Sequence, residues 1–329
     1  MFVRFNLPSA SRGKSCSLQA LSSRIVVRRP KGLKSSLCEE SHSLRRCCIG
    51  LEFLGTGVKS LMKNINAILF LIAALLLSSC ASLSPNGVGR VKRYIFADED
   101  IPEAFNGYKV AFVSDIHYPS LFTQKRLGKL TRRLQKESPD VLLLGGDYVT
   151  SVAYMDELFD SLSAVNPADG VFAVLGNHER RHKEITEHAM HGYGISLLVD
   201  TVVAIERGTD AIYLAGIYDS FVYDSLVVQP AETASDESFV MLLCHTPDYA
   251  ERSSTTADIV FSGHTHGGQV SFLGLYTPVK NTQYGNRFLR GMNRTTSGAT
   301  VITTTGVGTS RRKVRFCVPS EIVFVTLKN

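Results

Sequence analysis

The chain has no apolar run long enough to cross a bilayer comfortably. The unbroken run from Ala67 to Leu77 is eleven residues, whereas a membrane-spanning helix needs about 20. A run of this length instead suits the apolar region of a signal peptide, which spans about 7–15 residues. Since the run follows Met62-Lys63 and ends at Ser78-Ser79-Cys80, we expect a signal segment over 62–80.

The cysteines follow no metal-binding or redox pattern, and tryptophan is missing. None of the seven Cys residues forms a Cys-x-x-Cys pair, so the thiolate set of a closed structural zinc site is not present. Cys244 and Cys317 lie in or beside apolar runs, and we expect them to be buried free thiols rather than a disulfide. With 44% hydrophobic residues, the chain can still bury a sizeable core.

The folded part of the chain lacks an excess of positive charge. The net charge is +6, but residues 1–61 hold eleven Lys and Arg against three acidic residues, which leaves the remainder near −2. This distribution does not indicate a nucleic-acid-binding surface. The chain also shows no repeat of 20–50 residues.

The sequence before residue 107 divides into three stretches. Residues 1–61 are basic and without apolar periodicity, and they could be a transit peptide, a disordered arm, or a stretch upstream of a true start at Met62. The ending at 77–82 resembles a bacterial lipoprotein signal, which implies lipidation of Cys80 and attachment to a membrane. The alternatives are an uncleaved anchor or a buried helix with an incidental Cys. Residues 81–106 have the composition of a tether.

Strands and helices alternate from residue 107 to residue 329. Apolar runs separated by helical spacing predict a βαβαβ unit with a largely parallel sheet covered on both faces. After Gly194 short strands predominate, which predicts a second sheet packed on the first. Asp219–Ser238 is polar and predicts a surface loop. The expected helices are Gln124–Glu137, Tyr154–Ala164 and Lys183–His191. The expected strands are Lys109–Ser114, Val141–Leu144, Val171–Leu175, Ser196–Val199, Val202–Glu206, Ala211–Gly216, Phe239–Cys244, Ile259–Ser262, Val270–Phe272, Thr300–Thr304 and Glu321–Leu327.

Five polar clusters punctuate this region, and four of them follow a short apolar stretch. They are Ser114-Asp115-Ile116-His117, Gly145-Gly146-Asp147, Gly176-Asn177-His178-Glu179, Cys244-His245 and Gly263-His264-Thr265-His266. Asp, Asn and His are ligands for Mn, Fe or Zn. Clusters at strand ends meet at one edge of a sheet, so the pattern predicts a metal site. Each cluster alone is common, but five in this order are not.

In order and spacing, these clusters resemble the calcineurin-like metallophosphoesterases, in particular the bacterial small phosphodiesterases that end in Gly-His-Thr-His-Gly-Gly-Gln. The resemblance covers residues 107–329 and implies a four-layer α/β/β/α sandwich of two mixed sheets. It also implies two divalent metal ions, with Mn the first choice and Fe, Zn or Co also accepted. The first would take Asp115, His117, Asp147 and His266, and the second Asp147, Asn177, His245 and His264.

The same resemblance implies a reaction. Asp147 would bridge the two ions, which clamp a phosphate and generate a hydroxide for in-line attack. His178 would protonate the leaving oxygen or stabilise charge at phosphorus. Glu179 would either orient His178 or cap the following helix, and residues 306–310 would form a loop near the active face. We expect His182, His188 and His191 to be surface residues, and Arg311-Arg312-Lys313 to be a solvated turn that could also face an anionic substrate or lipid.

These features together predict a metal-dependent phosphohydrolase, of phosphodiesterase or pyrophosphatase type, attached to a membrane through Cys80. Membrane attachment favours a lipid-linked or envelope phosphate ester on the periplasmic or extracytoplasmic face. The alternative is a UDP-2,3-diacylglucosamine pyrophosphatase of lipid A synthesis, which would need the domain on the cytoplasmic face with an uncleaved anchor. A metal-binding scaffold without catalysis and a protein phosphatase are further alternatives.

Overall fold

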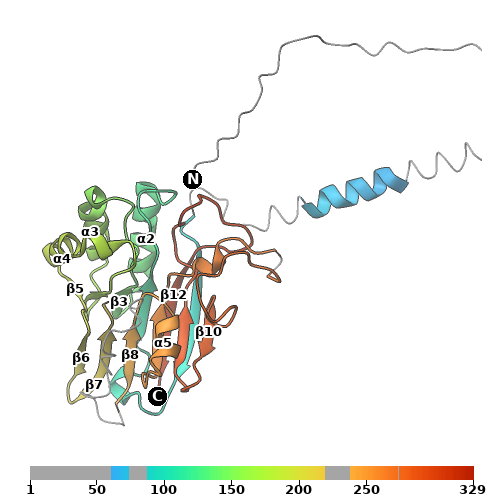
Figure 1. Ribbon diagram of the computed structural model, residues 1–329. Helices are drawn as coiled ribbons and strands as arrows, with labels where there is room; N and C mark the ends of the chain where they lie inside the picture. Colours follow the sequence, from blue (N-terminus) through green and yellow to red (C-terminus); the bar gives the residue numbers. More distant parts are fainter. Residues whose placement is uncertain (1–60, 74–86, 219–237, 273) are drawn as a thin grey trace, which may run out of the picture. The chain divides into compact units, whose positions relative to one another are not determined.

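Two six-stranded sheets form the core of the computed structural model, which describes residues 61–73, 87–218, 238–272 and 274–329 (Figure 1). Both sheets belong to the unit of residues 70–329. The first has the order β1-β12-β2-β3-β4-β5, and the second the order β10-β11-β9-β8-β7-β6. In the first, the strands are β1 (Arg90–Ala97), β12 (Glu321–Lys328), β2 (Lys109–Val113), β3 (Val141–Leu144), β4 (Val171–Ala173) and β5 (Ile195–Leu197). In the second, they are β10 (Gly291–Arg294), β11 (Thr300–Thr303), β9 (Ile259–Ser262), β8 (Val240–Leu243), β7 (Asp210–Gly216) and β6 (Thr201–Arg207).

Each sheet combines parallel and antiparallel strand pairs. The strands β2, β3, β4 and β5 pair in parallel, as the βαβαβ pattern predicts, while β12 runs antiparallel to β2. In the second sheet β7, β8, β9 and β11 are parallel, and β6 and β10 are antiparallel edge strands. The prediction of two mixed sheets is therefore confirmed.

Successive side chains along a strand point to opposite faces of its sheet, so each central strand contributes to two layers of the core. In β2, Val110 and Phe112 face the second sheet, where the Phe112 ring meets that of Phe261 with centroids 5.5 Å apart. Ala111 and Val113 point the other way, towards the helices. Since both faces of these central strands are buried, their sequences are continuous apolar runs rather than alternating ones.

Helices cover the outer face of each sheet. Leu127, Leu130 and Leu134 of α2 are fully or almost fully buried in the cluster that α2 shares with α3, α4 and the first sheet (Figure 1). On the second sheet, Tyr249 of α5 and Phe288 occupy the corresponding place. The predicted α/β/β/α order of layers is thus confirmed. The helices are α2 (Gln124–Glu137), α3 (Met155–Ser163), α4 (Lys183–Gly192) and α5 (Asp248–Arg252), with short 3-10 turns at η2 (Glu103–Phe105), η3 (Val152–Tyr154), η4 (Glu179–Arg181) and η6 (His266–Gly268).

Three local predictions are wrong. The tether expected over 81–106 contains β1 (Arg90–Ala97), which pairs with β12 over its whole length. Val270–Phe272 is not a strand, because it makes only isolated bridges, from Val270 to Phe316 and from Phe272 to Tyr276. No strand is expected at β10 (Gly291–Arg294), whose polar sequence pairs with β11.

Several predictions fall outside the described residues. Cys80, nearly all of the basic stretch 1–61 and nearly all of the loop expected over Asp219–Ser238 belong to this part of the chain. Residues 61–73 are helical, and apolar side chains such as Phe70 (77% exposed) lie on the surface of this helix. Among the residues that the structure describes, no helix has both the length and the apolar character needed to span a membrane.

Candidate metal centre

Every residue expected to bind metal lies beyond the end of a strand. Asp115 and His117 follow β2, and Asp147 follows β3. Because parallel strands present their carboxyl ends at the same edge of a sheet, these side chains meet there. The remaining strand ends supply Asn177 and His178 after β4, His245 after β8, and His264 and His266 after β9. The two sheets therefore contribute to a single site.

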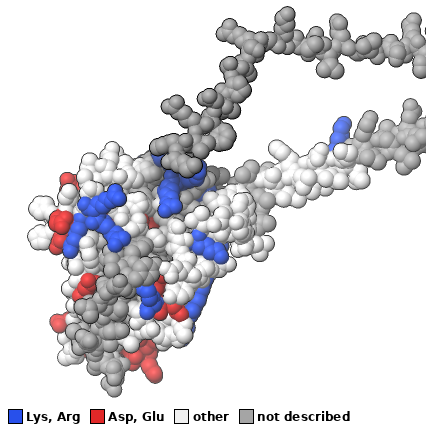
Figure 2. Space-filling model, viewed as in Figure 1, with Lys and Arg blue, Asp and Glu red and all other residues white. Residues whose placement is uncertain are grey.

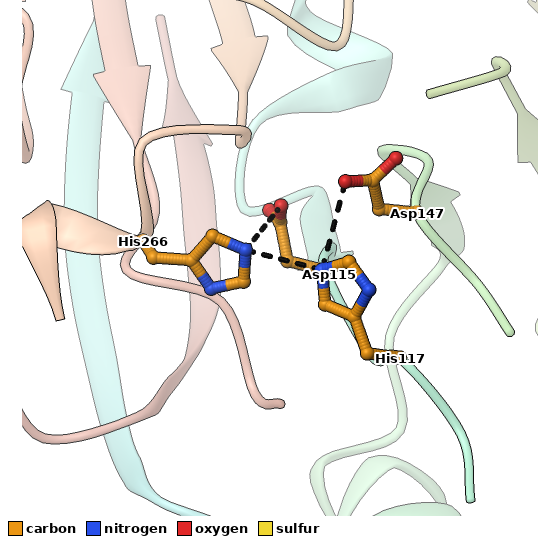
Figure 3. Close-up of side chains that lie close together, drawn as sticks. All are labelled: Asp115, His117, Asp147 and His266. Atoms are coloured by element: carbon orange, nitrogen blue, oxygen red, sulfur yellow. Dashed lines mark hydrogen bonds and ion pairs between the residues drawn. The ribbon is translucent and has the colours of Figure 1, made fainter. Parts of the chain in front are cut away.

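The first cluster contains Asp115, His117, Asp147 and His266, whose nearest ligand atoms all lie within 4.8 Å of one another (Figure 3). The Nε2 atoms of His117 and His266 are 3.1 Å apart. His266 Nε2 lies 3.2 Å from Asp115 Oδ1, and His117 Nε2 lies 3.5 Å from Asp147 Oδ2. All four residues are buried, so their polar atoms converge on a point that water reaches poorly.

A second cluster contains Asp147, His245 and His264, again within 4.8 Å of one another. His245 Nε2 is 3.6 Å from Asp147 Oδ2, and the rings of His245 and His264 have centroids 5.1 Å apart. Asp147 belongs to both clusters, the position expected of a carboxylate that bridges two cations. Its Oδ1 accepts a hydrogen bond from the backbone N–H of His178 at 3.0 Å.

Asn177 gives an independent indication of a cation at this place. Its Oδ1 atom is buried and has no hydrogen-bond partner in the structure. A buried amide oxygen without a partner is costly. A metal ion would satisfy it, and carboxamide oxygen and imidazole nitrogen are ligands that Mn, Fe, Zn and Co accept. The residues present thus suit two divalent metal ions.

The electrostatics of the clusters also favour bound cations. Burial lowers the pKa of His117 to about 4 and that of His264 to about 3, so both imidazoles are neutral at pH 7. Burial alone would raise the pKa of Asp147, but the positive charge of His245 holds it well below its usual value. Against the effect of burial, Asp147 in turn raises the pKa of His245 to about 10. The buried carboxylate therefore attracts positive charge, as a proton on His245 or as a metal ion.

Five of the seven proposed ligands share an uncommon backbone conformation. Asp115, His117, Asp147, His264 and His266 all have positive φ, between 49° and 65°. A non-glycine residue in this region is strained, and such strain persists at functional sites where the surrounding structure enforces it. Here this conformation occurs directly after β2, β3 and β9, the strands that these five residues follow.

Two glycines allow the strand ends to approach each other. A Cβ on Gly263 would lie 2.1 Å from Ser114 Oγ and 2.3 Å from Asp115 Oδ2. A Cβ on Gly176 would lie 2.3 Å from Asp147 Oδ1. Since real side chains do not pack so closely, the site requires glycine at these two positions.

His178 lies beside the clusters rather than within them. Its Nε2 atom is 3.9 Å from Asp147 Oδ2, and its ring centroid is 4.7 Å from that of His117. The side chain is 41% exposed, so a bound phosphate ester could reach it from solvent. This position suits a residue that contacts the substrate.

Glu179 does neither of the two things expected of it. Its Oε2 accepts hydrogen bonds from the backbone N–H groups of Asp147 (2.9 Å) and Gly176 (3.0 Å), and its Oε1 accepts one from Tyr148 (2.9 Å). The buried carboxylate therefore joins the loop after β3 to the loop after β4. It positions Asp147 through the main chain.

Sequence reasoning missed Arg315. Its guanidinium is buried and donates to the carbonyl oxygens of Thr305 (2.6 Å) and Gly308 (2.7 Å from Nη2, 2.9 Å from Nε). It thereby holds the loop of residues 306–310, in which Gly308 N–H donates to the carbonyl of Asp115 at 2.8 Å. That loop lies at the metal centre, as expected. Nothing in the sequence distinguishes Arg315 from its exposed basic neighbours, because its partners are backbone carbonyls.

The remaining expectations concern residues away from the site. His182, His188 and His191 are exposed. Cys244 is a buried thiol in contact with Ser262 Oγ at 3.2 Å, and burial raises its pKa to about 12, so it is a core residue. Cys317 is half-buried rather than buried.

The chain resembles known phosphoesterases in sequence. The model of the calcineurin-like phosphoesterase family matches residues 108–268. An uncharacterized metallophosphoesterase of Aquifex aeolicus is 30% identical over 254 residues, which is 73% of this chain and 92% of that protein. The phosphodiesterase YaeI of Escherichia coli is 28% identical over 211 residues, 61% of this chain and 75% of that protein. Among solved structures, a dimetal phosphatase from Danio rerio shares 12% identity, with a TM-score of 0.38, over 61% of this chain and 88% of that one.

Proposed function

Because the chain belongs to the calcineurin-like phosphoesterase family and is a metal-dependent hydrolase of phosphoric esters, we propose that it is a binuclear phosphodiesterase or pyrophosphatase attached to a membrane. The observation that carries the binuclear assignment is the position of Asp147, which belongs to both ligand clusters. Bound together, two divalent ions would activate a phosphate as Lewis acids and supply a nucleophile from water.

The chain's own residues have distinct tasks in this proposal. Asp115, His117 and His266 hold one ion, and Asn177, His245 and His264 hold the other, with Asp147 shared. His178 contacts the phosphate ester from the exposed side and delivers a proton to the leaving oxygen, or stabilises charge at phosphorus. The buried surroundings of the clusters exclude bulk water, which strengthens every electrostatic interaction in the site.

We propose Mn as the resident metal, with Fe, Zn or Co as the alternatives. The donor set combines hard carboxylate and carboxamide oxygens with imidazole nitrogens. It contains no thiolate, since the thiol of Cys244 contacts Ser262 Oγ in the core instead. Such a set accepts all four metals, so availability during folding decides which is bound.

Membrane attachment and a lipid-linked or envelope substrate complete the proposal. They are supported by the signal-like residues 62–80, by Cys80 after Ser78-Ser79, and by the exposed apolar side chains on the helix of residues 61–73. With Cys80 lipidated, the domain would lie on the periplasmic or extracytoplasmic face. With the segment uncleaved, the domain would face the cytoplasm, where a UDP-linked lipid becomes a candidate substrate.

An assay of the full chain after reconstitution with Mn tests the enzymatic part. Turnover of a phosphodiester, a phosphomonoester and a UDP-linked lipid identifies the preferred bond. Asn177→Ala should lower kcat/KM by about 10–100-fold or more, because it removes a metal ligand. Asn286→Ala, at an exposed position, is the matched control and should leave turnover unchanged. Equal turnover by the wild type and Asn177→Ala would refute the binuclear assignment.

Metabolic labelling with palmitate tests the anchor separately. Cys80→Ala should abolish incorporation of the label, while Cys244→Ala, a change in the core, should not. An unlabelled wild-type protein would exclude lipidation and leave the hydrolase assignment intact.

A further inference from the structure

Exposed apolar side chains gather on a turn between β9 and β10. Phe272, Leu275 and Tyr276 expose 51%, 84% and 63% of their surface. The turn is closed by hydrogen bonds from Phe272 N–H to the Tyr276 carbonyl (2.8 Å) and from Leu275 N–H to the Phe272 carbonyl (3.0 Å). The rings of Phe272 and Tyr276 stack with centroids 6.2 Å apart. These three residues, which we term the apolar tip, are thus exposed to solvent.

The apolar tip is connected to the metal centre. Ser271 N–H donates to the Phe316 carbonyl (2.9 Å), and Phe316 N–H donates to the Gln269 carbonyl (2.9 Å). The side chain of Gln269 donates to the carbonyls of Arg312 (3.1 Å) and Val314 (3.2 Å). Gln269 follows His266 by three residues, so the turn, the basic segment 311–314 and a proposed ligand form one continuous structure.

The segment of residues 311–314 contributes exposed positive charge to this structure. Residues 263–320 contain eight Lys and Arg and no Asp or Glu, although the chain beyond residue 61 has a net charge near −2. Arg311, Arg312 and Lys313 are all exposed. On this side of the domain, to the right of α2 in the view, Figure 2 shows mostly uncharged surface with basic side chains beside it. The charge is complementary to an anionic surface.

A cavity of about 650 Å³ lies between the basic segment and the metal centre. His266 and Gln269 line one part of it. Val270, Val279 and Val314 supply apolar wall, and Arg311 and Arg312 also line it. Val279 and Val314 are themselves 52% and 42% exposed. An amphiphilic phosphate ester could pass along this cavity from an apolar phase to the clusters.

We propose that the apolar tip inserts into the surface of an anionic lipid bilayer, with Arg311, Arg312 and Lys313 against the lipid phosphates. Apolar and aromatic side chains projecting from a turn, backed by exposed cations, match the requirements of the bilayer interface. The cavity beside His266 then opens towards the lipid. This contact is separate from any anchor at Cys80 and stands whether or not that residue is lipidated.

The lack of Trp in the chain provides a local test. Leu275→Trp places a single indole on the apolar tip of the full chain. On addition of phosphatidylglycerol vesicles its emission should shift to shorter wavelength and be quenched by lipids with brominated acyl chains. With phosphatidylcholine vesicles, or with Arg311→Ser and Arg312→Ser added, both responses should decrease.

Ile95→Trp is the matched control. Ile95 is 72% exposed and pairs with Thr326, which pairs with Lys109 at the start of β2. It therefore lies at the end of the sheet remote from the ligands, and its emission should not respond to vesicles. No shift and no quenching at position 275, or an equal response at position 95, would overturn the proposal. Hydrolysis of a water-soluble diester by Leu275→Trp, measured in the same samples, tests the enzyme assignment separately.

Discussion

Glu179 and Arg315 are buried charged residues that act on the main chain rather than on a substrate. The carboxylate of Glu179 receives three backbone N–H groups, and the guanidinium of Arg315 donates to the carbonyls of residues 305 and 308. Glu179 thus fixes the loop that carries Asp147, and Arg315 fixes the loop of residues 306–310, which contacts Asp115. Charged groups are well suited to this task because their hydrogen bonds are stronger than those between neutral partners.

We expect Glu179→Gln to destabilise the protein by about 1–3 kcal/mol, because an amide NH2 would replace one acceptor and leave a buried N–H without a partner. Turnover should fall as well, since Asp147 loses its support. Urea unfolding and a diester assay measure the two effects. Glu184→Gln, an exposed change on α4, serves as the control. If Glu179→Gln unfolded at the same urea concentration as the wild type, these three hydrogen bonds would contribute little to the free energy of unfolding.

These roles could not be predicted from the sequence. The ligand residues could, because Asp, Asn and His recur at strand ends in a fixed order. Glu179 and Arg315, by contrast, bond to backbone groups, and backbone groups are the same at every position. Which carbonyl or N–H faces a side chain depends on the path of loops far apart in the sequence.

At the scale of the elements, the loop after β9 comes very close to the loop after β2, where Gly263 faces Ser114 and Asp115. We expect Gly263→Ala to cost about 1–3 kcal/mol, as overpacking does in a close-packed interior. It should also lower kcat by about 100-fold, because the added methyl displaces Asp115. Gly192→Ala is the control, since its Cβ would meet nothing within 4 Å. Thermal unfolding and the diester assay give the comparison, and normal activity in Gly263→Ala would contradict the geometry.

A second element-scale prediction concerns Asp258, whose Oδ2 accepts a hydrogen bond from Val240 N–H at 2.7 Å and so joins β9 to β8. Burial, with the charges of Asp98 and Asp100, raises its pKa from 3.8 to about 6. The ionised form is thus disfavoured in the folded state. The contribution of Asp258 to the free energy of unfolding is therefore fully present below about pH 4, and it is lost as the pH rises through about 6.

Asp258→Asn keeps the acceptor and removes the charge. It should therefore stabilise the protein at pH 7, by about 1 kcal/mol after allowance for solvent screening of a partly exposed group. The gain should vanish below pH 4, where Asp258 is protonated. Urea unfolding at pH 4 and pH 7 provides the measurement, and a gain of equal size at both pH values would exclude the charge as its cause.

The elements themselves were predictable to different degrees. The helix α2 and the strands β3 and β9 begin and end where the sequence predicts, because Gly, Ser or Pro bounds a strong apolar pattern. The strands β1 and β10 were not predicted, since they lie at sheet edges and most of their residues are exposed or half-buried, so neither carries the continuous buried run of a central strand. Their pairing depends on β12 and β11, which no local pattern indicates. Val270–Phe272 has the apolar composition of a strand but no neighbouring strand with which to form a ladder.

At the scale of the whole molecule, the metal centre joins the two sheets. Asp115, Asp147 and Asn177 come from the first sheet, and His245, His264 and His266 come from the second. Metal bound to the folded state alone contributes about 2.7 kcal/mol at 100 times its dissociation constant. At about 2–4 °C per kcal/mol for a domain of this size, a chelator should lower the Tm by about 5–10 °C.

Differential scanning calorimetry with and without the chelator, and after addition of Mn, measures this change. His266→Ala should remove most of the response to Mn, whereas the exposed His188→Ala should keep it. A Tm that is independent of chelator and metal would show that the clusters do not bind a cation in the folded state.

The pairing of β1 with β12 also affects how the chain can acquire its fold. Arg90 lies opposite Glu321, and β12 itself lies between β1 and β2. As a ribosome extends the chain, β1 and β2 emerge early, but β1 cannot take its place in the finished sheet until β12, the strand that separates the two, has been synthesised. The first sheet is therefore completed only after almost the whole domain has left the ribosome. Until then, the edge of β2 that β12 covers stays without its partner strand.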